Sequence, residues 1–102
     1  MNNKHKPIKV HQLLVDKSNW TQGRYALDID GKFVHPGDKA VCWCLWGAII
    51  QVYVATTQPT INSIIDIITP RISYNYSSIT DWNDDPDRTF EQVRNLCVEL
   101  DI

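Results

Sequence analysis

The chain has 102 residues, of which 43% are hydrophobic and 22% are charged, so it can bury a core and lacks the composition of a disordered protein. Its formal net charge of −2 argues against a nucleic-acid binder, which needs an excess of Lys and Arg to displace counterions. We therefore expect a single domain over residues 1–102, with residues 1–6 disordered.

The cysteines and the apolar runs bear on the cell compartment. Cys42, Cys44 and Cys97 are odd in number and lie among apolar residues, which is typical of reduced core thiols. The N-terminal residues contain no hydrophobic signal core. The longest nearly apolar run, 40–55, is shorter than the roughly 20 residues that span a membrane. The sequence therefore predicts a soluble cytoplasmic protein that does not contact a membrane.

A short amphipathic helix is predicted over residues 7–17. Pro7 suits the first turn of a helix, where its missing N–H is harmless. Val10, Leu13 and Leu14 then follow at the spacing of one helical face, which would be the buried face.

A β-hairpin is predicted over residues 24–35. Apolar residues alternate on both sides of Asp30-Gly31, a dipeptide that favours a type I′ turn. This turn would place Leu27 opposite Val34. Because an isolated hairpin is marginally stable, we expect it to pack against the helices.

The central element is predicted to be a buried helix over about residues 39–54, capped by Asp38. Its stretch 40–50 carries no charge and contains two tryptophans and two cysteines, which indicates burial on all sides. Gly47 in the interior of this helix would cost about 1 kcal/mol relative to Ala. We expect a close contact with another helix or with the hairpin to compensate.

Two further helices follow. The first begins at Thr60 as N-cap, is ended or kinked by Pro70, and has a buried face formed by Ile61, Ile64, Ile65, Ile68 and Ile72. The last begins at the capping box of Thr89 and Gln92, after an acidic turn over 81–89. Residues 73–79 fit either a helical turn or a loop. The predicted fold is α+β and mainly α, with about four helices arranged around the central one and one hairpin.

Residue types that bind metals are present, but their spacing does not suit a site. Cys42 and Cys44 would point in opposite directions on a helix, so they could not both reach one zinc ion. The segment that begins at Asp81 imitates a calcium loop, but Pro86 and Gln92 stand where that loop needs Gly and Glu. We expect neither a metal nor a cofactor.

Cys44 is the only cysteine for which a nucleophilic role can be constructed. His35 could serve as its base, with Asn83 or Asp84 orienting that base. In the middle of a helix, however, apolar neighbours would raise the pKa of the thiol and hide it. We therefore assign no catalytic residue and keep a cysteine-dependent hydrolase as an alternative.

The candidate binding site combines aromatic, basic and polar residues from two parts of the chain: Trp20, Arg24, Trp82, Asn83, Asp84 and Arg88. The tryptophans would provide an aromatic floor, and the arginines a bidentate clamp for an anion. Trp and Arg also dominate protein interfaces. The competing interpretation is a rigid loop at the start of a helix, with Trp82 in the core.

Four motifs in a fixed order carry a resemblance to a known family: Trp-Thr-Gln-Gly at 20–23, Asp-Ile-Asp-Gly at 28–31, Ala-Val-Cys-Trp-Cys-Leu-Trp-Gly-Ala at 40–48, and Trp-Asn-Asp at 82–84 followed by Arg-Thr at 88–89. Together they resemble a family of small bacterial and bacteriophage proteins described only as a domain of unknown function. The likeness runs from about Ile8 to Leu100. It implies one compact domain and a phage or mobile-element source, and it carries no activity.

The expected function is that of a non-enzymatic binding or interaction protein with a protein partner, in particular an accessory or counter-defence factor of a phage or mobile element. A binding protein for a small anionic ligand, such as a nucleotide, and the hydrolase are the alternatives. An interaction protein should expose an apolar patch of roughly several hundred Å² and have no deep pocket. A ligand binder should have a concave site that joins Arg24 or Arg88 to an aromatic residue. A hydrolase needs Cys44 exposed and close to His35.

Overall fold

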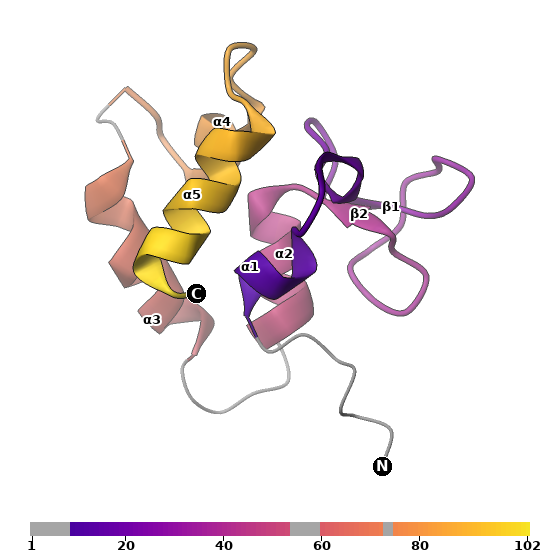
Figure 1. Ribbon diagram of the computed structural model, residues 1–102, viewed down its shortest axis with the longest axis horizontal. Helices are drawn as coiled ribbons and strands as arrows, with labels where there is room; N and C mark the ends of the chain where they lie inside the picture. Colours follow the sequence, from indigo (N-terminus) through magenta and orange to yellow (C-terminus); the bar gives the residue numbers. More distant parts are fainter. Residues whose placement is uncertain (1–8, 54–59, 73–74) are drawn as a thin grey trace.

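The computed structural model describes residues 9–53, 60–72 and 75–102 (Figure 1). Within them the chain forms five α-helices, two 3-10 helices and two short strands. In chain order these are α1 (Val10–Leu13), η2 (Lys17–Asn19), β1 (Ala26–Leu27), β2 (Cys42–Trp43), α2 (Leu45–Tyr53), α3 (Ile61–Ile68), η3 (Thr69–Arg71), α4 (Ile79–Asp84) and α5 (Phe90–Leu100). The predicted class, α+β and mainly α, is confirmed.

The first helix, α1, is shorter than predicted. It ends at Leu13, because Leu14 leaves the helical conformation with ψ 66°. The guanidinium of Arg94 on α5 donates from Nη1 to the main-chain oxygens of His11 at 2.6 Å and Leu14 at 3.0 Å. These bonds satisfy carbonyl groups that a longer helix would use internally. The predicted start at Pro7 lies outside the described residues, as does the predicted disorder of residues 1–6.

The sheet pairs segments that are distant in sequence. Strands β1 and β2 are antiparallel, with Ala26 opposite Trp43 and Leu27 opposite Cys42. Trp20 forms an isolated parallel bridge with Trp43 as well. The hairpin therefore packs against the beginning of the central element, as Figure 1 shows at β1 and β2.

The hairpin turn forms, but the predicted register is wrong by one residue. Leu27 lies opposite Phe33 rather than Val34. The carboxylate of Asp28 accepts hydrogen bonds at 2.9 Å from two main-chain N–H groups of the loop, and Gly31 adopts φ 79°. These bonds favour a three-residue loop with a left-handed glycine over the two-residue type I′ turn.

The central helix begins at Leu45, so the predicted helix is wrong for residues 39–44. The main chain of that segment bonds across to an earlier segment instead: Val41 N donates to Leu27 O at 2.8 Å, and Cys44 N donates to Tyr25 O at 3.2 Å. Cys42 and Trp43 consequently form β2. Apolar residues that are buried on all sides cannot be assigned to a helix or a strand by periodicity, which is why the boundary was missed.

The expected close contact at Gly47 is confirmed. A Cβ atom at this position would lie 1.9 Å from the main-chain oxygen of Tyr25, which is far inside van der Waals contact. Only glycine allows α2 to approach the hairpin backbone so closely. This contact fixes the position of β1 against the first turn of α2. The predicted end of the helix at residue 54 lies outside the described residues.

The caps of α3 and α5 are confirmed. The hydroxyl of Thr60 accepts from Ser63 N at 3.1 Å. Thr89 and Gln92 form the predicted reciprocal capping box. Pro70 also acts as predicted, since α3 ends at Ile68 and continues only as the 3-10 turn η3.

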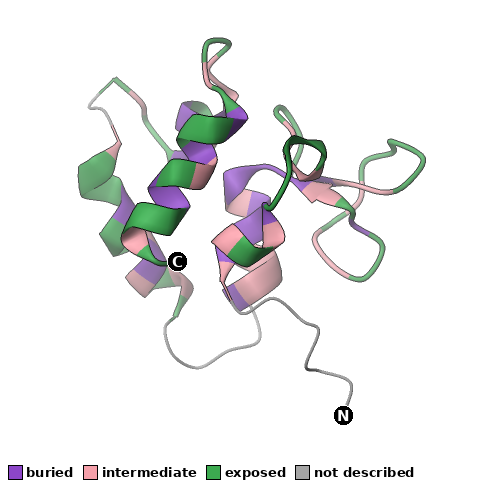
Figure 2. Cartoon of the chain, viewed as in Figure 1, coloured by how far each residue is buried: buried purple, intermediate pink, exposed green. Residues whose placement is uncertain are grey.

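Helix α4 was not predicted, because the segment over 81–89 was expected to be a turn throughout. Ser78 caps it by accepting from Asp81 N at 3.0 Å. Its buried residues, Ile79, Trp82 and Asn83, place one face of the helix against the core. Figure 2 shows buried residues where the helices face one another and exposed residues on the outer side of α5. The core therefore contains residues from all five α-helices and both strands.

Candidate functional site

Asn83 is the only polar residue in the described part of the chain that is fully buried, and it lies at the centre of the candidate site. Its Oδ1 accepts from the indole Nε1 of Trp20 at 2.7 Å and from the main-chain N of Leu45 at 3.0 Å. Its Nδ2 donates to Thr21 O at 3.2 Å and to Asp84 Oδ1 at 2.9 Å. All four hydrogen-bonding capacities of the amide are thus used.

The Gln22-Gly23 segment clamps the end of α4. Gln22 Nε2 donates to the main-chain oxygens of Asn83 and Asp85, both at 2.9 Å. Gly23 N, in a residue with φ 80°, donates to Asp84 Oδ1 at 3.0 Å. The Trp-Thr-Gln-Gly and Trp-Asn-Asp motifs therefore bind each other, which explains why these residue types occur in both segments.

Arg88 is held within the fold by aromatic and polar contacts. Its guanidinium lies 3.9 Å from the ring centroid of Trp82, a cation–π geometry, and its Nε donates to Trp82 O at 2.9 Å. Nη1 donates to Gln92 at 3.2 Å. Nearby, the hydroxyl of Tyr76 donates to the Asp85 carboxylate, and this bond lowers the pKa of Asp85 and raises the pKa of Tyr76.

The structure thus brings most of the predicted site residues together, but it engages them with one another. One network of contacts joins the Gln22-Gly23 segment, the start of α2 and the start of α5. Its predicted members are Trp20, Trp82, Asn83 and Arg88. Asp84 is partly in this network and partly open. Arg24 is exposed, and its one described bond is a long one, 3.4 Å to Gly23 O.

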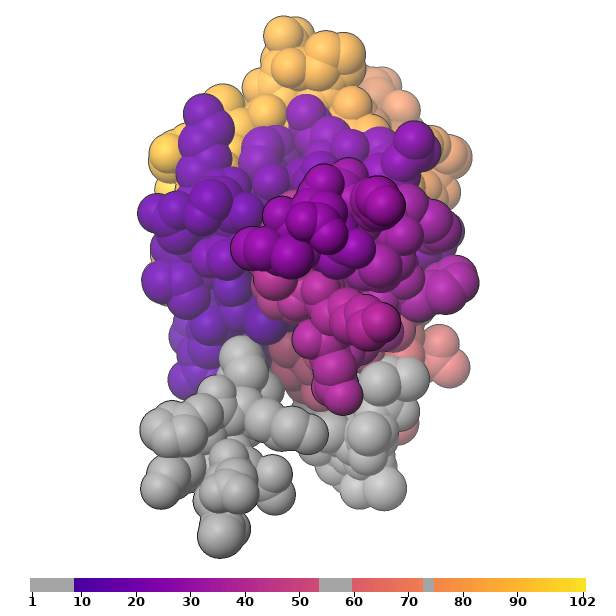
Figure 3. Space-filling model, turned by 90° about the vertical axis from the view of Figure 1, so that its right-hand side faces the viewer, coloured from indigo at the N-terminus to yellow at the C-terminus, as the bar shows by residue number. Residues whose placement is uncertain are grey.

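A hollow of about 480 Å³ adjoins this network on the hairpin face, the surface formed by residues 23–35. Its described lining residues are Gly23, Arg24, Tyr25, Phe33, Thr80 and Asp84. Tyr25 is 42% exposed and Phe33 is 52% exposed. Figure 3 looks onto the side of the molecule where these purple and magenta segments reach the surface.

Phe33 is the residue of this hollow that sequence reasoning missed. It follows the Asp-Gly turn, and an aromatic side chain beside a tight hairpin turn was the available signal. Its ring also contacts His35 edge-on, with 5.5 Å between centroids. Ile29 in the same hairpin is 82% exposed, so the loop presents a further apolar side chain to solvent.

Cys44 lies at the N-terminal end of α2, not in the middle of a helix as predicted. Its Sγ accepts from Gly47 N at 3.3 Å, as a capping side chain does. The residue is 1% exposed, and burial raises the pKa of its thiol. His35 is exposed on the hairpin. A buried, capping thiol with a raised pKa does not have the properties of a nucleophile.

Neither a metal-binding group nor a membrane-spanning helix is found among the residues that the structure describes. Cys42, Cys44 and Cys97 are free thiols. No group of three or more His, Cys, Asp or Glu side chains among the described residues is arranged to hold a metal ion. No helix within those residues combines the length and apolarity needed to cross a bilayer.

Fold and site together define a small, mainly α domain with a buried asparagine network and an adjoining aromatic hollow. The family of unknown function DUF6197 matches residues 8–99, so the chain belongs to this family. Comparisons with curated proteins and with solved structures give no significant match. This match confirms the predicted resemblance to a family of unknown function, and the family itself has no assigned activity.

Proposed function

We propose that this chain is a non-enzymatic binding protein and that its hairpin face binds a protein partner. The observation that carries the proposal is the exposed cluster of Arg24, Tyr25 and Phe33 around one hollow. Tyrosine and arginine are enriched among residues that dominate the energy of protein interfaces. Aromatic side chains also bury a large apolar area when a partner covers them.

The hollow rests on a rigid base, which favours binding without reorganisation. The main-chain N–H of Gly23 donates a hydrogen bond to the Asp84 carboxylate, and the main-chain oxygen of Tyr25 packs closely against Gly47. The backbone beneath Arg24 and Tyr25 is therefore fixed from both sides. A preformed surface pays less conformational entropy on association than a mobile loop does.

The hollow joins Arg24 to the aromatic residues Tyr25 and Phe33, as expected of a ligand binder, but its charges favour a protein partner over a small anion. The Asp84 carboxylate lines the same hollow as the Arg24 guanidinium. An anion bound to the arginine would lie near this carboxylate, and like charges repel at such range. A protein surface can present both a carboxylate and a cation, with an apolar group for Ile29 and Phe33. A nucleotide or similar anionic ligand is kept as the alternative outcome.

The partner is proposed to be a bacterial host protein in the cytoplasm. The resemblance to small bacterial and bacteriophage proteins supports this assignment. In that setting the chain would act as an accessory or counter-defence factor of a phage or mobile element. Since such a role requires binding rather than turnover, it agrees with the burial of Cys44.

The test compares the wild-type chain with Phe33→Asp and with Val98→Asp. Val98 is 49% exposed on α5, so it controls for a new charge at an exposed apolar site outside the hollow. Each tagged chain is used to isolate partners from a bacterial lysate, and the identified protein is then purified for calorimetric titration. We expect wild type and Val98→Asp to bind it alike, and Phe33→Asp to bind at least 10-fold more weakly.

Two outcomes would contradict the proposal. Equal binding by a folded Phe33→Asp variant would remove the hairpin face from the interaction. Isolation of a nucleotide or another small anion without a protein would instead favour the ligand-binding alternative. A second substitution, Arg24→Ala, separates these cases, because an anion site would depend on it most strongly.

A further inference from the structure

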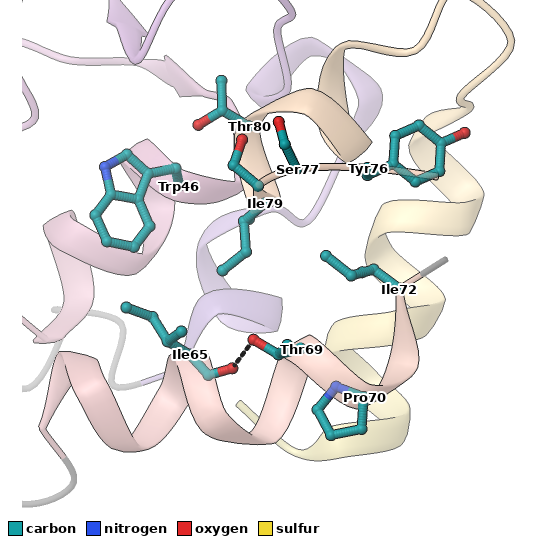
Figure 4. Close-up of a pocket in the computed structure, with 10 residues that line it drawn as sticks. Trp46, Ile65, Thr69, Pro70, Ile72, Tyr76, Ser77, Ile79 and Thr80 are labelled. Atoms are coloured by element: carbon teal, nitrogen blue, oxygen red, sulfur yellow. Dashed lines mark hydrogen bonds between the residues drawn. The ribbon is translucent and has the colours of Figure 1, made fainter. Parts of the chain in front are cut away.

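A larger cavity of about 810 Å³ lies between α3 and α4, beside Trp46 of α2 (Figure 4). Its described lining residues are Trp46, Ile65, Thr69, Pro70, Ile72, Tyr76, Ser77, Ser78, Ile79 and Thr80. This volume falls within the roughly 300–1,000 Å³ typical of small-molecule sites. The candidate site described above does not include it.

The apolar side chains around this cavity come from separate elements. Figure 4 shows Ile65 of α3, Ile79 of α4 and Ile72 after η3 converging on it, with the indole of Trp46 of α2 at one side. Ile79 is buried, and the other three are half-buried. A molecule in the cavity would therefore contact apolar surface from several directions.

The described lining contains no charged side chain. A charged ligand would lose its hydration there without gaining a counter-charge, which is unfavourable. An uncharged ligand avoids this cost. The composition of the cavity thus selects against phosphates, carboxylates and charged ammonium groups.

Several of the polar groups around the cavity are already used within the fold. Thr69 donates to Ile65 O at 2.7 Å, as the dashed line in Figure 4 shows. Ser78 accepts from Asp81 N at 3.0 Å, and Tyr76 donates to the Asp85 carboxylate. A hydrophilic ligand would find few available partners, so the binding energy must come from apolar contact.

We propose that this cavity binds an uncharged, mainly apolar small molecule, in particular one with an aromatic or alicyclic ring system. Thr80 lines both this cavity and the hollow of the hairpin face. The other lining residues that the tests change belong to only one of the two, so the two proposals can fail separately.

The test uses two fluorescent probes with the same rings, the uncharged N-phenyl-1-naphthylamine and the anionic 8-anilino-1-naphthalenesulfonate. The full chain is titrated into each probe. From the binding efficiency typical of drug-sized molecules, the uncharged probe should bind at one site with a Kd of about 0.2 mM or tighter. The sulfonate should bind at least 10-fold more weakly, because its charge meets an uncharged lining.

Variants locate the binding. Ile65→Trp fills the cavity from α3 and should weaken binding of the uncharged probe at least 10-fold. Ile67→Trp is the matched control, since Ile67 lies on the same helix, is 41% exposed and does not line the cavity. Thr69→Glu adds a charge at an exposed lining residue, so it should fold even if Ile65→Trp does not, and it should also weaken binding.

The proposal is overturned by any of three results: no saturable signal with the uncharged probe, equal affinity for the sulfonate, or undiminished binding by folded Thr69→Glu. Phe33→Asp should bind the uncharged probe as wild type does. This variant distinguishes failure here from failure of the proposed hairpin interface.

Discussion

The main-chain nitrogen of Leu45 donates to the side-chain oxygen of Asn83 at 3.0 Å. Leu45 is the first residue of α2, and the first N–H groups of a helix have no partner within it. A residue at the end of α4 therefore completes the start of α2. The same Asn83 oxygen accepts from Trp20 Nε1 at 2.7 Å, so one amide joins three segments of the fold.

Removal of this amide should destabilise the protein strongly. Asn83→Ala leaves the Trp20 and Leu45 N–H groups without an acceptor, at about 1–3 kcal/mol for each unsatisfied buried group. We expect a loss of about 2–4 kcal/mol in the free energy of unfolding, measured by urea denaturation. Asn95→Ala, at an exposed position on α5, should change it by less than about 0.5 kcal/mol. A loss below 1 kcal/mol for Asn83→Ala would contradict the central role of the network.

Gly47→Ala should be poorly tolerated. Its Cβ would collide with the Tyr25 main-chain oxygen, and a backbone atom cannot move aside as a flexible side chain can. We expect destabilisation of roughly 3 kcal/mol or more through overpacking, measured as a lower denaturation midpoint. Gly37→Ala is the control, because its Cβ would meet nothing closer than 3.9 Å. Similar behaviour of the two variants would rule out the close contact.

Thr89→Ala removes the hydroxyl that accepts from Gln92 N at 3.1 Å. Loss of such a cap costs about 1 kcal/mol. Thr89→Ser retains an acceptor in the same place and should retain most of the stability. Urea denaturation of both variants checks this, and equal losses would show that the hydroxyl does not cap α5.

Alkaline pH should weaken the fold through Cys97. Burial raises the pKa of this thiol to about 12, from an ordinary value of 9.0. Between these two values the unfolded chain loses a proton that the folded chain retains, so stability present below pH 9 falls as pH rises. The slope from this group is up to about 1.4 kcal/mol per pH unit.

The measurement is the free energy of unfolding from pH 8 to 10.5 for wild type and Cys97→Ala. The substitution also leaves a cavity, but that cost is independent of pH, so the slope is the informative quantity. A shallower slope in the variant supports the assignment. Burial raises the pKa of Cys42 and Cys44 as well, so part of the slope should remain.

Thiol labelling should separate the cysteines by burial. Cys42 is half-buried, whereas Cys44 and Cys97 are buried. With Ellman's reagent at pH 8, Cys42 should react first, and Cys42→Ser should remove the fast phase. Cys44 and Cys97 should react fully only after denaturation. Rapid labelling of Cys44 in the folded protein would instead revive the hydrolase alternative.

The correct predictions concern features in which the interacting residues are close in sequence. The caps at Thr60 and Thr89 each join positions three residues apart, and the stop at Pro70 is a property of one residue. The prediction of where α2 begins was wrong because that boundary depends on Asn83 and on backbone pairing with residues 21–27. Both lie far from the boundary in sequence. Helix α4 was not predicted because a serine followed by acidic residues is also typical of a turn.

The candidate site shows the same division. Trp20, Asn83 and Arg88 were selected as candidate binding residues because their types are unusual in combination, and the structure places them in one hydrogen-bonded network. That these residues bind one another could not be predicted, because the sequence does not show which hydrogen-bond donor pairs with which acceptor. Phe33 was missed because its exposure depends on the hairpin register, and the turn at Asp28 shifted that register by one residue.

The bond between Leu45 and Asn83 spans 38 positions of the chain. During translation, the first turn of α2 is synthesised before the amide that completes it. The Trp20 indole is synthesised earlier still and donates to the same acceptor. The domain should therefore acquire its native order late, in one cooperative step once α4 has emerged, and stalled nascent chains that end before residue 83 should remain sensitive to protease.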